Sequence, residues 1–322
     1  MKIVMVWNKT LQRGNVHKMD IGFWNTYYSL MQLGHEVYFY DTASQPEKGL
    51  LEVVDSFKPV HGADKSYSEI IDSFKPDLIF CIMTGDANIA PKEPWTEILK
   101  ETNSGRTKTF NWFCDDTWRF DTFSSKVCNT FHVCSTVEKD YIEKFKEIGY
   151  NNIIHGMWHT NLDFYPRVGE KDIDISFCGI PNVERESFTN ALKNQGLPVE
   201  YRYGISHEDM CELFARSRIS LNFSKNMTLT PPRRQIKARL FEVPAGRSLL
   251  CTEETPGLEE YYKLDEEVVT FTSSLELYEK CKYLLENENV RRKMAENGFE
   301  RFKKEHESRQ RLPKILNDIM RS

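Results

Sequence analysis

The first forty residues change between strand-like and helix-like patterns, and this alternation most restricts the possible folds. Residues 2–7 (KIVMVW) are an apolar, β-branched run that predicts a buried strand. Residues 20–34 then place apolar side chains at helical spacing, and Gly34 is expected to end that helix. Residues 35–41 (HEVYFYD) predict a second strand. A strand, a helix and a strand in this order are typical of a parallel α/β sheet.

The same alternation continues along the chain. Because a domain usually contains about 100–200 residues, a chain of 322 residues predicts two domains. A polar stretch at residues 161–170, which holds Pro166 and Gly169, is the expected linker. We therefore expect two doubly wound α/β domains with a cleft between them, and ligands at the carboxyl ends of their strands. Further strands are expected at residues 77–83, 107–113, 130–134, 172–179, 199–203, 219–223, 248–251 and 268–271, and helices at residues 67–74, 94–101, 136–148, 183–194, 207–217, 235–241, 256–261, 274–285, 290–305 and 309–320.

The composition indicates a globular protein without a membrane-embedded body. Hydrophobic residues make up 40% of the chain, which is enough for two cores, and the mean hydropathy is -0.55. The longest apolar run, residues 78–83, is far shorter than the ~18–20 residues that span a bilayer. Residues 1–9 turn polar too early for a signal peptide, so we expect a cytoplasmic protein. The net charge of -5 provides no global basic field for nucleic acid, although a local basic patch is compatible with it.

Several common catalytic and cofactor motifs are absent from the sequence. It has no Gly-x-Gly-x-x-Gly after the first strand, no P-loop and no Gly-x-Ser-x-Gly, which argues against nicotinamide dehydrogenases, P-loop phosphotransferases and serine hydrolases. The eight cysteines include no Cys-x-x-Cys pair, so we expect buried reduced thiols instead of a zinc or redox site. His155 and His159 have the spacing of two metal ligands on a helix, but no Glu follows His155, and we expect no metal site.

The densest group of functional candidates lies in residues 230–246 (TPPRRQIKARLFEVPAG). Two prolines end a loop, and four cations follow within seven residues where a helix is expected to begin. A helix N-terminus carries partial positive charge and free N–H groups, and with added Arg and Lys it can hold a diphosphate without a metal. A solvated basic face is the alternative explanation of such a charge run. The apolar end of the segment, with Glu242 as its one acid, favours the anion site.

At these residues the chain resembles a known family, the CgeB-like glycosyltransferases. The resemblance is strongest over residues 172–312 and weaker at residues 34–37 and 112–116. It implies a GT-B architecture, in which two Rossmann-like domains face a cleft and the donor is a nucleotide sugar. The segments that carry it are residues 235–246, 249–252, 255–260, 283–285, 291–298 and 306–309.

The resemblance also implies how the chain is divided. Residues 1–165 would form the N-terminal, acceptor-binding domain, and residues 166–307 the C-terminal, nucleotide-sugar-binding domain. Residues 308–322 would form a C-terminal helix that packs back on the first domain. Cations and a helix dipole would replace a metal in such a site, so we expect a metal-independent hexosyl- or pentosyltransferase without a cofactor, for which the nucleotide sugar is a co-substrate.

Most donor contacts are implied for the basic segment. Glu242 would accept hydrogen bonds from the ribose hydroxyls of the donor, and Arg234, Lys237 and Arg239 are candidates for the diphosphate. Arg234 stands where many retaining GT-B enzymes carry a second glutamate, so this chain lacks that acid. A structural alternative makes Glu242 an ion-pair partner of Lys237 or Arg239 that fixes the helix.

Three further residues of the second domain belong to the expected donor site. Gly179 follows the first strand of that domain, and Arg185 comes six residues later, so that backbone and guanidinium could both approach a phosphate. Gly257 lies in the run TPGLEE, which is part of the resemblance.

In the first domain, two adjacent acids follow an apolar strand. Asp115 and Asp116 could act as a general base or bind an acceptor hydroxyl, and the flanking Trp112 and Trp118 offer flat faces for a sugar or a base. The alternative is a capping pair with core aromatics. Their spacing and their expected domain argue against a metal-binding Asp-x-Asp motif.

The loop expected at residues 8–18, after the first strand, should face the cleft. His17 in this loop and Asp20 just beyond it are further candidates for the catalytic base.

Together these observations predict a glycosyltransferase that moves a sugar from a nucleotide-diphosphate donor, most simply a UDP-sugar, to a hydroxyl acceptor. The acceptor could be a saccharide, a protein or a small molecule. One alternative is a phage-type glycosyltransferase that modifies hydroxylated DNA bases with the help of basic and aromatic residues. Another is a non-catalytic protein that binds a sugar nucleotide.

Overall fold

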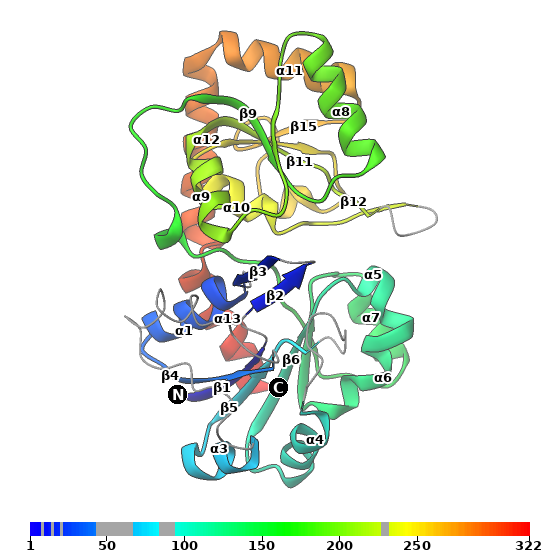
Figure 1. Ribbon diagram of the computed structural model, residues 1–322. Coiled ribbons are helices and arrows are strands. Elements are labelled where there is room, and N and C mark those ends of the chain that lie inside the picture. Colours follow the sequence, from blue (N-terminus) through cyan, green and yellow to red (C-terminus); the bar gives the residue numbers. More distant parts are fainter. Residues whose placement is uncertain (8–9, 14–15, 20–21, 43–66, 84–93, 227–231) are drawn as a thin grey trace. The chain divides into compact units, whose positions relative to one another are not determined.

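The computed structural model forms two compact α/β units (Figure 1). Unit 1 comprises Met1–Met157 and Leu312–Ser322, and unit 2 comprises Trp158–Arg311. The chain therefore passes between the units twice, at residues 157–158 and again within the last helix, α13 (Ser308–Arg321). The first passage lies just before the polar stretch in which the sequence places the linker. The structure describes residues 1–7, 10–13, 16–19, 22–42, 67–83, 94–226 and 232–322.

Unit 1 is built on a six-stranded sheet with the order β4-β1-β5-β6-β7-β8, in which all neighbours are parallel. Strand β1 lies between β4 and β5, where Val4 is opposite both Tyr38 and Ile79. An interior strand of a parallel sheet is covered on both faces, which explains why β1 is a continuous apolar run instead of an alternating one. The strands are β1 (Lys2–Trp7), β4 (Glu36–Asp41), β5 (Leu78–Cys81), β6 (Lys108–Phe113), β7 (Val133–Thr136) and β8 (Ile153–His155).

The segment after β1 differs from the sequence prediction. Within the expected loop, β2 (Thr10–Arg13) and β3 (Val16–Met19) form an antiparallel pair. Two four-residue runs separated by Gly and Asn are a hairpin pattern, which the polar character of the segment obscures. The following helix consists of a π-helical part, η1 (Phe23–Tyr27), and α1 (Tyr28–Gln32), and Gly34 ends it with φ of 82° as expected.

Several helices of unit 1 lie where the sequence indicates them, but a cluster of short ones is missed. These helical segments fill the connection between β6 and β7, where the sequence pattern predicts no helix. Besides η1 and α1, the described helices of unit 1 are α3 (Tyr67–Phe74), α4 (Trp95–Ser104), α5 (Asp116–Arg119), η2 (Phe120–Ser124), α6 (Ser125–Val127), η3 (Cys128–Thr130) and α7 (Tyr141–Glu147).

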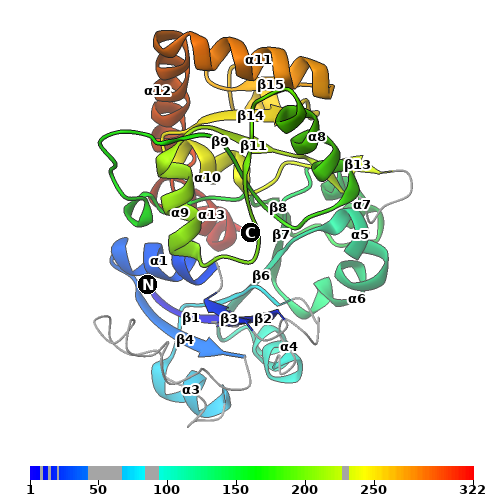
Figure 2. The same ribbon diagram turned by 45° about the horizontal axis from the view of Figure 1, so that its top comes forward.

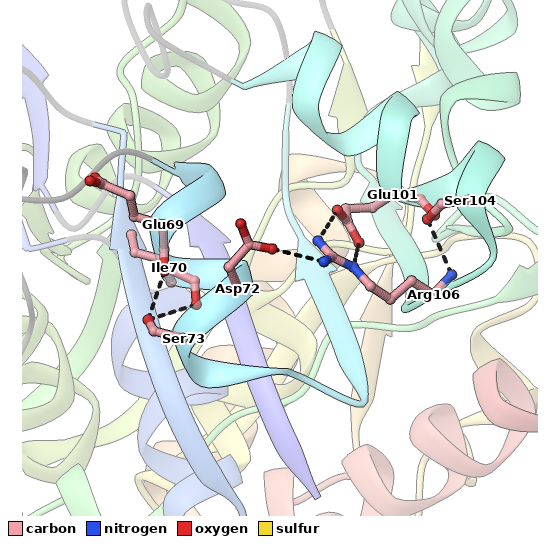
Figure 3. A network of polar contacts seen from close by, with 7 residues as sticks. All are labelled: Glu69, Ile70, Asp72, Ser73, Glu101, Ser104 and Arg106. Carbon is pink, nitrogen blue, oxygen red and sulfur yellow. Dashed lines mark hydrogen bonds and ion pairs between the residues drawn. The ribbon is translucent and has the colours of Figure 1, made fainter.

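Arg106 connects α3 and α4 through two carboxylates (Figure 3). Its Nη2 and Nε donate to Glu101 at 2.6 and 3.1 Å, and its Nη1 donates to Asp72 at 2.8 Å. Glu101 is buried, whereas about half of the Arg106 side chain is exposed. A buried carboxylate without a partner is costly, so the planar guanidinium both satisfies Glu101 and links the two helices.

Unit 2 is built on a five-stranded parallel sheet with the order β10-β9-β11-β14-β15. The chain leaves β9 towards one side for β10 and then crosses to the other side for β11. Ligands of open α/β sheets bind outside the carboxyl ends of strands at such a switch point, here between β9 and β11. The strands are β9 (Ile173–Cys178), β10 (Glu200–Arg202), β11 (Ser217–Asn222), β14 (Leu249–Glu253) and β15 (Val269–Phe271).

Helices cover both faces of this sheet. In unit 2, α8 and α11 lie together on one face, and α9, α10 and α12 lie on the other (Figures 1 and 2). No helix in the described ranges has the length and apolar character needed to cross a bilayer. The helices of unit 2 are η4 (Leu162–Phe164), α8 (Val183–Asn194), α9 (His207–Arg216), α10 (Arg239–Ala245), η5 (Leu258–Glu260), α11 (Ser274–Glu286) and α12 (Glu288–Glu305).

The basic segment begins its helix later than expected. The sequence pattern places a helix at residues 235–241, but α10 begins at Arg239, and Pro244 lies inside its last turn. Before it, β12 (Lys225–Asn226) and β13 (Arg233–Arg234) form a short antiparallel ribbon. The helix expected at residues 256–261 is only the short 3-10 turn η5. Glu242 therefore lies in the first turn of α10 and not at its end.

Candidate functional site

The sequence candidates of unit 2 include a group at the β9/β11 switch point. Gly179 follows β9, and Arg185 lies in the first turn of α8. Arg239 is the first residue of α10, and Glu242 lies one turn further on. The end of one strand and the starts of two helices thus bring these four residues to the edge where a parallel sheet binds ligands.

Gly179 lies where the backbone has no room for a side chain. A Cβ atom there would lie 2.7 Å from Cζ of Phe177 and 3.0 Å from Nη2 of Arg239. Its own N–H donates to the carbonyl of Arg202 on β10 at 3.0 Å, so the loop is held against the sheet. The glycine therefore permits a close approach between the end of β9 and the Arg239 guanidinium.

Two guanidinium groups share one aromatic ring in this site. Cζ of Arg239 lies 5.1 Å and Cζ of Arg185 lies 5.6 Å from the ring centroid of Phe177. Nη1 of Arg239 donates to Asn222 Oδ1 at 2.8 Å, and Nη1 of Arg185 donates to the Ile180 carbonyl at 2.6 Å. Burial lowers the pKa of both arginines, and for Arg185 the neighbouring Arg239 lowers it further. An anion bound here would relieve that repulsion.

Two buried donors of the site have no hydrogen-bond partner among the described residues. They are Nε of Arg185 and the hydroxyl of Tyr201 on β10, whose ring packs edge-to-face on Phe177 at 4.9 Å. Sequence reasoning overlooks Tyr201 because an aromatic residue in a strand resembles core. Buried donors without partners are rare in folded proteins, and oxygen atoms of a ligand would satisfy them.

Glu242 is a buried carboxylate to which no described residue donates a hydrogen bond. Its side chain is 5% exposed, and within the described part of the chain no group donates to it or forms an ion pair with it. Burial raises its pKa to about 7, and Arg239 opposes this shift only in part. The ammonium of Lys237 instead donates to Gln235, and Arg239 donates to Asn222. The structure therefore does not contain the ion pair that would make Glu242 a helix-fixing residue.

Arg234 and Lys237 precede α10 instead of lying on it. Arg234 belongs to β13 and pairs in register with Lys225 of β12, whose ammonium forms an ion pair with Glu184 on α8. Gly257 has φ of 82° immediately before η5, a conformation that a glycine adopts without strain. These residues supply cations and a turn around the strand ends.

A buried acid that sequence reasoning does not single out organises this edge. Glu253 ends β14 and is 2% exposed. It accepts hydrogen bonds from the backbone N–H groups of Ser224 and Lys225 at 2.6 and 3.2 Å and from the Ser224 hydroxyl at 3.1 Å. It thereby fixes the turn that leads from β11 into the basic ribbon. In the sequence, the one feature that could have indicated this role of Glu253 is its place at the carboxyl end of a predicted strand.

In unit 1, the two adjacent aspartates differ sharply in environment. Asp115 is partly exposed, with φ of 61° at the start of α5. Asp116 is fully buried, and neither of its oxygens has a regular hydrogen bond within the described residues. Burial raises the pKa of Asp116 to about 6, while the nearby Ser124 and Thr136 hydroxyls oppose the shift. Asp115 is thus the one of the pair that an acceptor could reach.

The two flanking tryptophans also differ. Trp112 is 3% exposed and packs in the core, so it offers no free face to a sugar. Trp118 is 42% exposed, and the guanidinium of Arg119 lies 4.4 Å from its ring centroid. Trp118 therefore remains as the flat surface beside Asp115 in the sequence.

The other candidates for the base and for a metal site receive less support. His17 lies in β3 opposite Gln12, and Asp20 lies outside the described residues. His159 is buried in unit 2, with its Nδ1 2.8 Å from the Ser308 hydroxyl, and burial lowers its pKa to about 3. The described ranges contain no group of three or more His, Cys, Asp or Glu side chains that could hold a metal ion.

Comparison with known proteins finds a family model that matches about half of the chain and structures of similar fold over nearly all of it. A family model described as glycosyl transferase-like matches residues 149–317. The structure is similar to HepE of Anabaena in complex with UDP-glucose, with a TM-score of 0.67, 12% identity, and 98% of this chain and 99% of that chain covered. It is also similar to a glycosyltransferase of Rickettsia africae, with a TM-score of 0.64, 12% identity, and 99% and 98% covered.

The DNA-modifying enzyme β-glucosyltransferase, studied with uridine diphosphoglucose, is a third match. Its TM-score is 0.61 at 13% identity, and the match covers 99% of this chain and all of that chain. No curated protein matches the sequence. At identities this low the structural matches establish a shared fold, while the family match rests on the sequence itself.

Proposed function

Because this chain belongs to the glycosyl transferase-like family and has the GT-B fold, we propose that it transfers a sugar from a UDP-sugar to a hydroxyl acceptor. We further propose that it is a CgeB-like enzyme that works without a metal ion. The UDP preference is supported by the uridine nucleotides in the structures of similar fold. The observation that carries the proposal is the pair of guanidinium groups of Arg185 and Arg239 at Gly179, with an unpaired buried donor on Arg185.

These groups suit the diphosphate of a nucleotide sugar. The backbone of Gly179 leaves room for an oxygen to approach, and the two guanidinium groups supply charge-assisted donors in a partly dry site. The N-terminus of α8 adds its dipole from the same side as Arg185. Glu242, to which no residue in the described ranges donates, is assigned to the ribose hydroxyls, because two hydroxyl donors would satisfy its carboxylate oxygens.

The proposed reaction needs a stabilised leaving group and a positioned acceptor. The bond between the anomeric carbon and the diphosphate oxygen breaks, and a bond to the acceptor oxygen forms. Negative charge then increases on the diphosphate, where the cations of Arg185 and Arg239 are already in place. The proton of the acceptor hydroxyl passes to a base, for which Asp115 is the accessible carboxylate of the pair in unit 1.

Donor binding tests the proposal most directly. UDP-, GDP- and dTDP-sugars would be screened by thermal stabilisation and then titrated by calorimetry. The variant Arg185→Met should weaken binding of the best donor by about tenfold or more, since it removes a charge-assisted contact. Lys193→Met, an exposed cation on the same helix, is the matched control and should bind as the unaltered protein does. Equal affinity of both variants would remove the diphosphate site from Gly179.

The acceptor is distinguished by a separate measurement. If hydroxylated DNA is the acceptor, its affinity should fall steeply with salt, with a slope of about -0.9 in log K per neutralised phosphate. A flat response, or no binding at low salt, favours a saccharide, a protein or a small molecule. A protein that binds the donor but shows neither transfer nor donor hydrolysis with any acceptor would be a sugar-nucleotide-binding protein instead.

A further inference from the structure

Unit 2 has a cavity at the edge of its sheet opposite the donor candidates. We call it the basal pocket. Two of its cations mark the amino ends of the strands, since Lys171 lies just before β9 and Arg218 is the second residue of β11. The donor candidates lie at the carboxyl ends of the same strands. The pocket has a volume of about 540 Å³, which is within the range of small-molecule sites, and its cations are Lys171, Arg218, Arg247, Arg291, Arg292 and Lys293.

The cations of the basal pocket outnumber its anions by three. Its only lining carboxylates are Glu170, Glu288 and Glu296, against six basic side chains. Glu296 pairs with Arg247 at 2.9 Å, and Glu288 pairs with Arg292 at 3.0 Å. Arg218 forms an ion pair with Asp174, which lies outside the lining, at 2.5 Å, and Glu288 also lies 3.8 Å from Arg291. Six cations therefore face four nearby acids, and Lys171 and Lys293 form no ion pair with a described residue.

Two of the cations donate hydrogen bonds to backbone carbonyls. Lys171 Nζ donates to the carbonyls of Ala215 and Gly246 at 2.7 and 3.2 Å. Arg291 is 5% exposed, and its Nη1 donates to the Leu284 carbonyl at 3.1 Å. Neutral carbonyls orient both groups without balancing their charge. Arg291 shares the carboxylate of Glu288, at 3.8 Å, with Arg292, and no acid among the described residues forms an ion pair with Lys171.

The electrostatics show the consequence of this arrangement. Burial, together with the nearby charges of Arg247 and Arg291, lowers the pKa of Lys171 to about 8. Burial also lowers the pKa of Arg291. Arg247 is pre-positioned, because its guanidinium lies 3.6 Å from the Phe299 ring centroid and its backbone has φ of 54°. These cations thus repel one another in a cavity whose neighbouring acids are too few to neutralise all of them.

We propose that the basal pocket binds a small molecule that carries two or more phosphate groups. Several separated cations match several phosphates better than a single carboxylate, and arginine forks bind phosphate oxygens in pairs. Because the basal pocket lies at the other edge of the sheet, its ligand binds in addition to the donor and not in its place. A free phosphorylated metabolite and a phosphorylated lipid headgroup present the same chemistry to these residues.

Calorimetric titration of the full-length protein with tripolyphosphate, at saturating UDP, tests the proposal. We expect one tripolyphosphate per chain. The surface variant Lys293→Glu should weaken binding by about tenfold or more, since it reverses a charge at the pocket without altering the core. Arg291→Met should do the same, but Arg291 is buried, so its variant is used only if its melting temperature shows that it is folded. Lys304→Met, an exposed cation elsewhere on α12, is the control and should bind normally.

Three outcomes would overturn the proposal: no binding by the unaltered protein, unchanged binding by Lys293→Glu, or displacement of tripolyphosphate by UDP, which would place the anion in the donor site.

A co-sedimentation assay distinguishes the source of the phosphates. It compares phosphatidylcholine vesicles with and without phosphatidylinositol bisphosphate. Recruitment that Lys293→Glu abolishes identifies a lipid headgroup, whereas tripolyphosphate binding without recruitment identifies a soluble ligand, and both support the pocket.

Discussion

A Cβ atom on Gly179 would lie 3.0 Å from Nη2 of Arg239. The same atom would lie 2.7 Å from Cζ of Phe177, whose ring is fully buried and cannot move aside. The absence of a side chain after β9 is thus what lets the first residue of α10 reach the strand end. The glycine and the arginine act as one unit, although 60 residues separate them in the sequence.

The variant Gly179→Ala tests this relationship. Overpacking of this kind usually costs about 1–3 kcal/mol, and the displaced Arg239 should also weaken nucleotide binding. Urea unfolding and donor titration would measure the two effects. Gly169→Ala is the matched control, because a Cβ there meets nothing within 4 Å. Equal stability of the two variants would show that the space around Gly179 is not limiting.

The Arg106 link between α3 and α4 gives a prediction for the scaffold of unit 1. Arg106→Met leaves the buried Glu101 carboxylate without its two donors, which should lower stability by about 1–3 kcal/mol. Chemical denaturation would measure the loss. The double variant that also replaces Glu101 by Gln should recover part of it, because the unpaired charge is gone. A full loss retained in the double variant would mean that the contact with Asp72 matters more.

The sequence predicts the order of strands and helices well because each element carries its own local pattern. Strand β9 and helix α8 illustrate this, since the apolar run and the Asn182 cap that begins α8 at Val183 are both local features. The candidates Gly179, Arg185 and Arg239 come together for a related reason. Each follows a strand or begins a helix on the same edge of one parallel sheet, so the topology alone places them there.

What the sequence could not provide depends on packing between distant segments. Residues 235–238 have a helical composition, yet the backbone N–H of Gln235 bonds to Ser224, and the helix starts only at Arg239. The partner of Glu253 is likewise a turn far away in the chain. Asp116 is buried and Asp115 is partly exposed because of the way α5 packs. The sequence does not show which of two adjacent residues faces the core.

Asp116 should make stability depend on pH. The folded protein holds its proton up to about pH 6, whereas the unfolded chain releases it near 3.8, so stability falls as pH rises between these values. The variant Asp116→Asn should lack this decrease and be more stable at neutral pH by about 1–3 kcal/mol. Unfolding experiments across this range would measure it. A parallel pH dependence in both proteins would mean that Asp116 keeps an ordinary pKa.

The two aspartates should also separate in catalysis. Asp115→Asn should lower kcat for transfer by about a hundredfold or more with little change in KM for the donor, since it removes the proposed base. Stability should be almost unchanged, because Asp115 is partly exposed. Steady-state kinetics with the identified donor would provide both constants. An unaltered kcat would return the role of base to another residue of unit 1, such as His17.

Chelation tests the proposed independence of metal ions. Cations of Arg185 and Arg239 occupy the place that a divalent metal takes in other diphosphate sites, so donor hydrolysis and transfer should persist in EDTA. The measurement is the rate with and without chelator, followed by addition of Mg²⁺ or Mn²⁺. A rate that disappears in EDTA and returns only with the metal would show that the diphosphate site has been assigned incorrectly.

Glu242 should lower the stability of the free protein near neutral pH. Its carboxylate is buried, and no described residue donates to it, so ionisation is opposed and its pKa rises to about 7. The unfolded chain releases this proton near 4.5, and stability therefore falls as pH rises from that value to about 7. A residue that costs stability in the free protein is explained if a ligand supplies the missing donors.

The variant Glu242→Gln keeps the shape of the side chain and removes its charge. At pH values above about 7 it should raise the free energy of unfolding by about 1–3 kcal/mol, because the buried charge is lost. It should also weaken donor binding by about tenfold or more, because charge-assisted bonds to the ribose hydroxyls are lost. Denaturation and donor titration on the same variant would measure both. A lower melting temperature with unchanged donor affinity would instead make Glu242 a helix-fixing residue and remove it from the site.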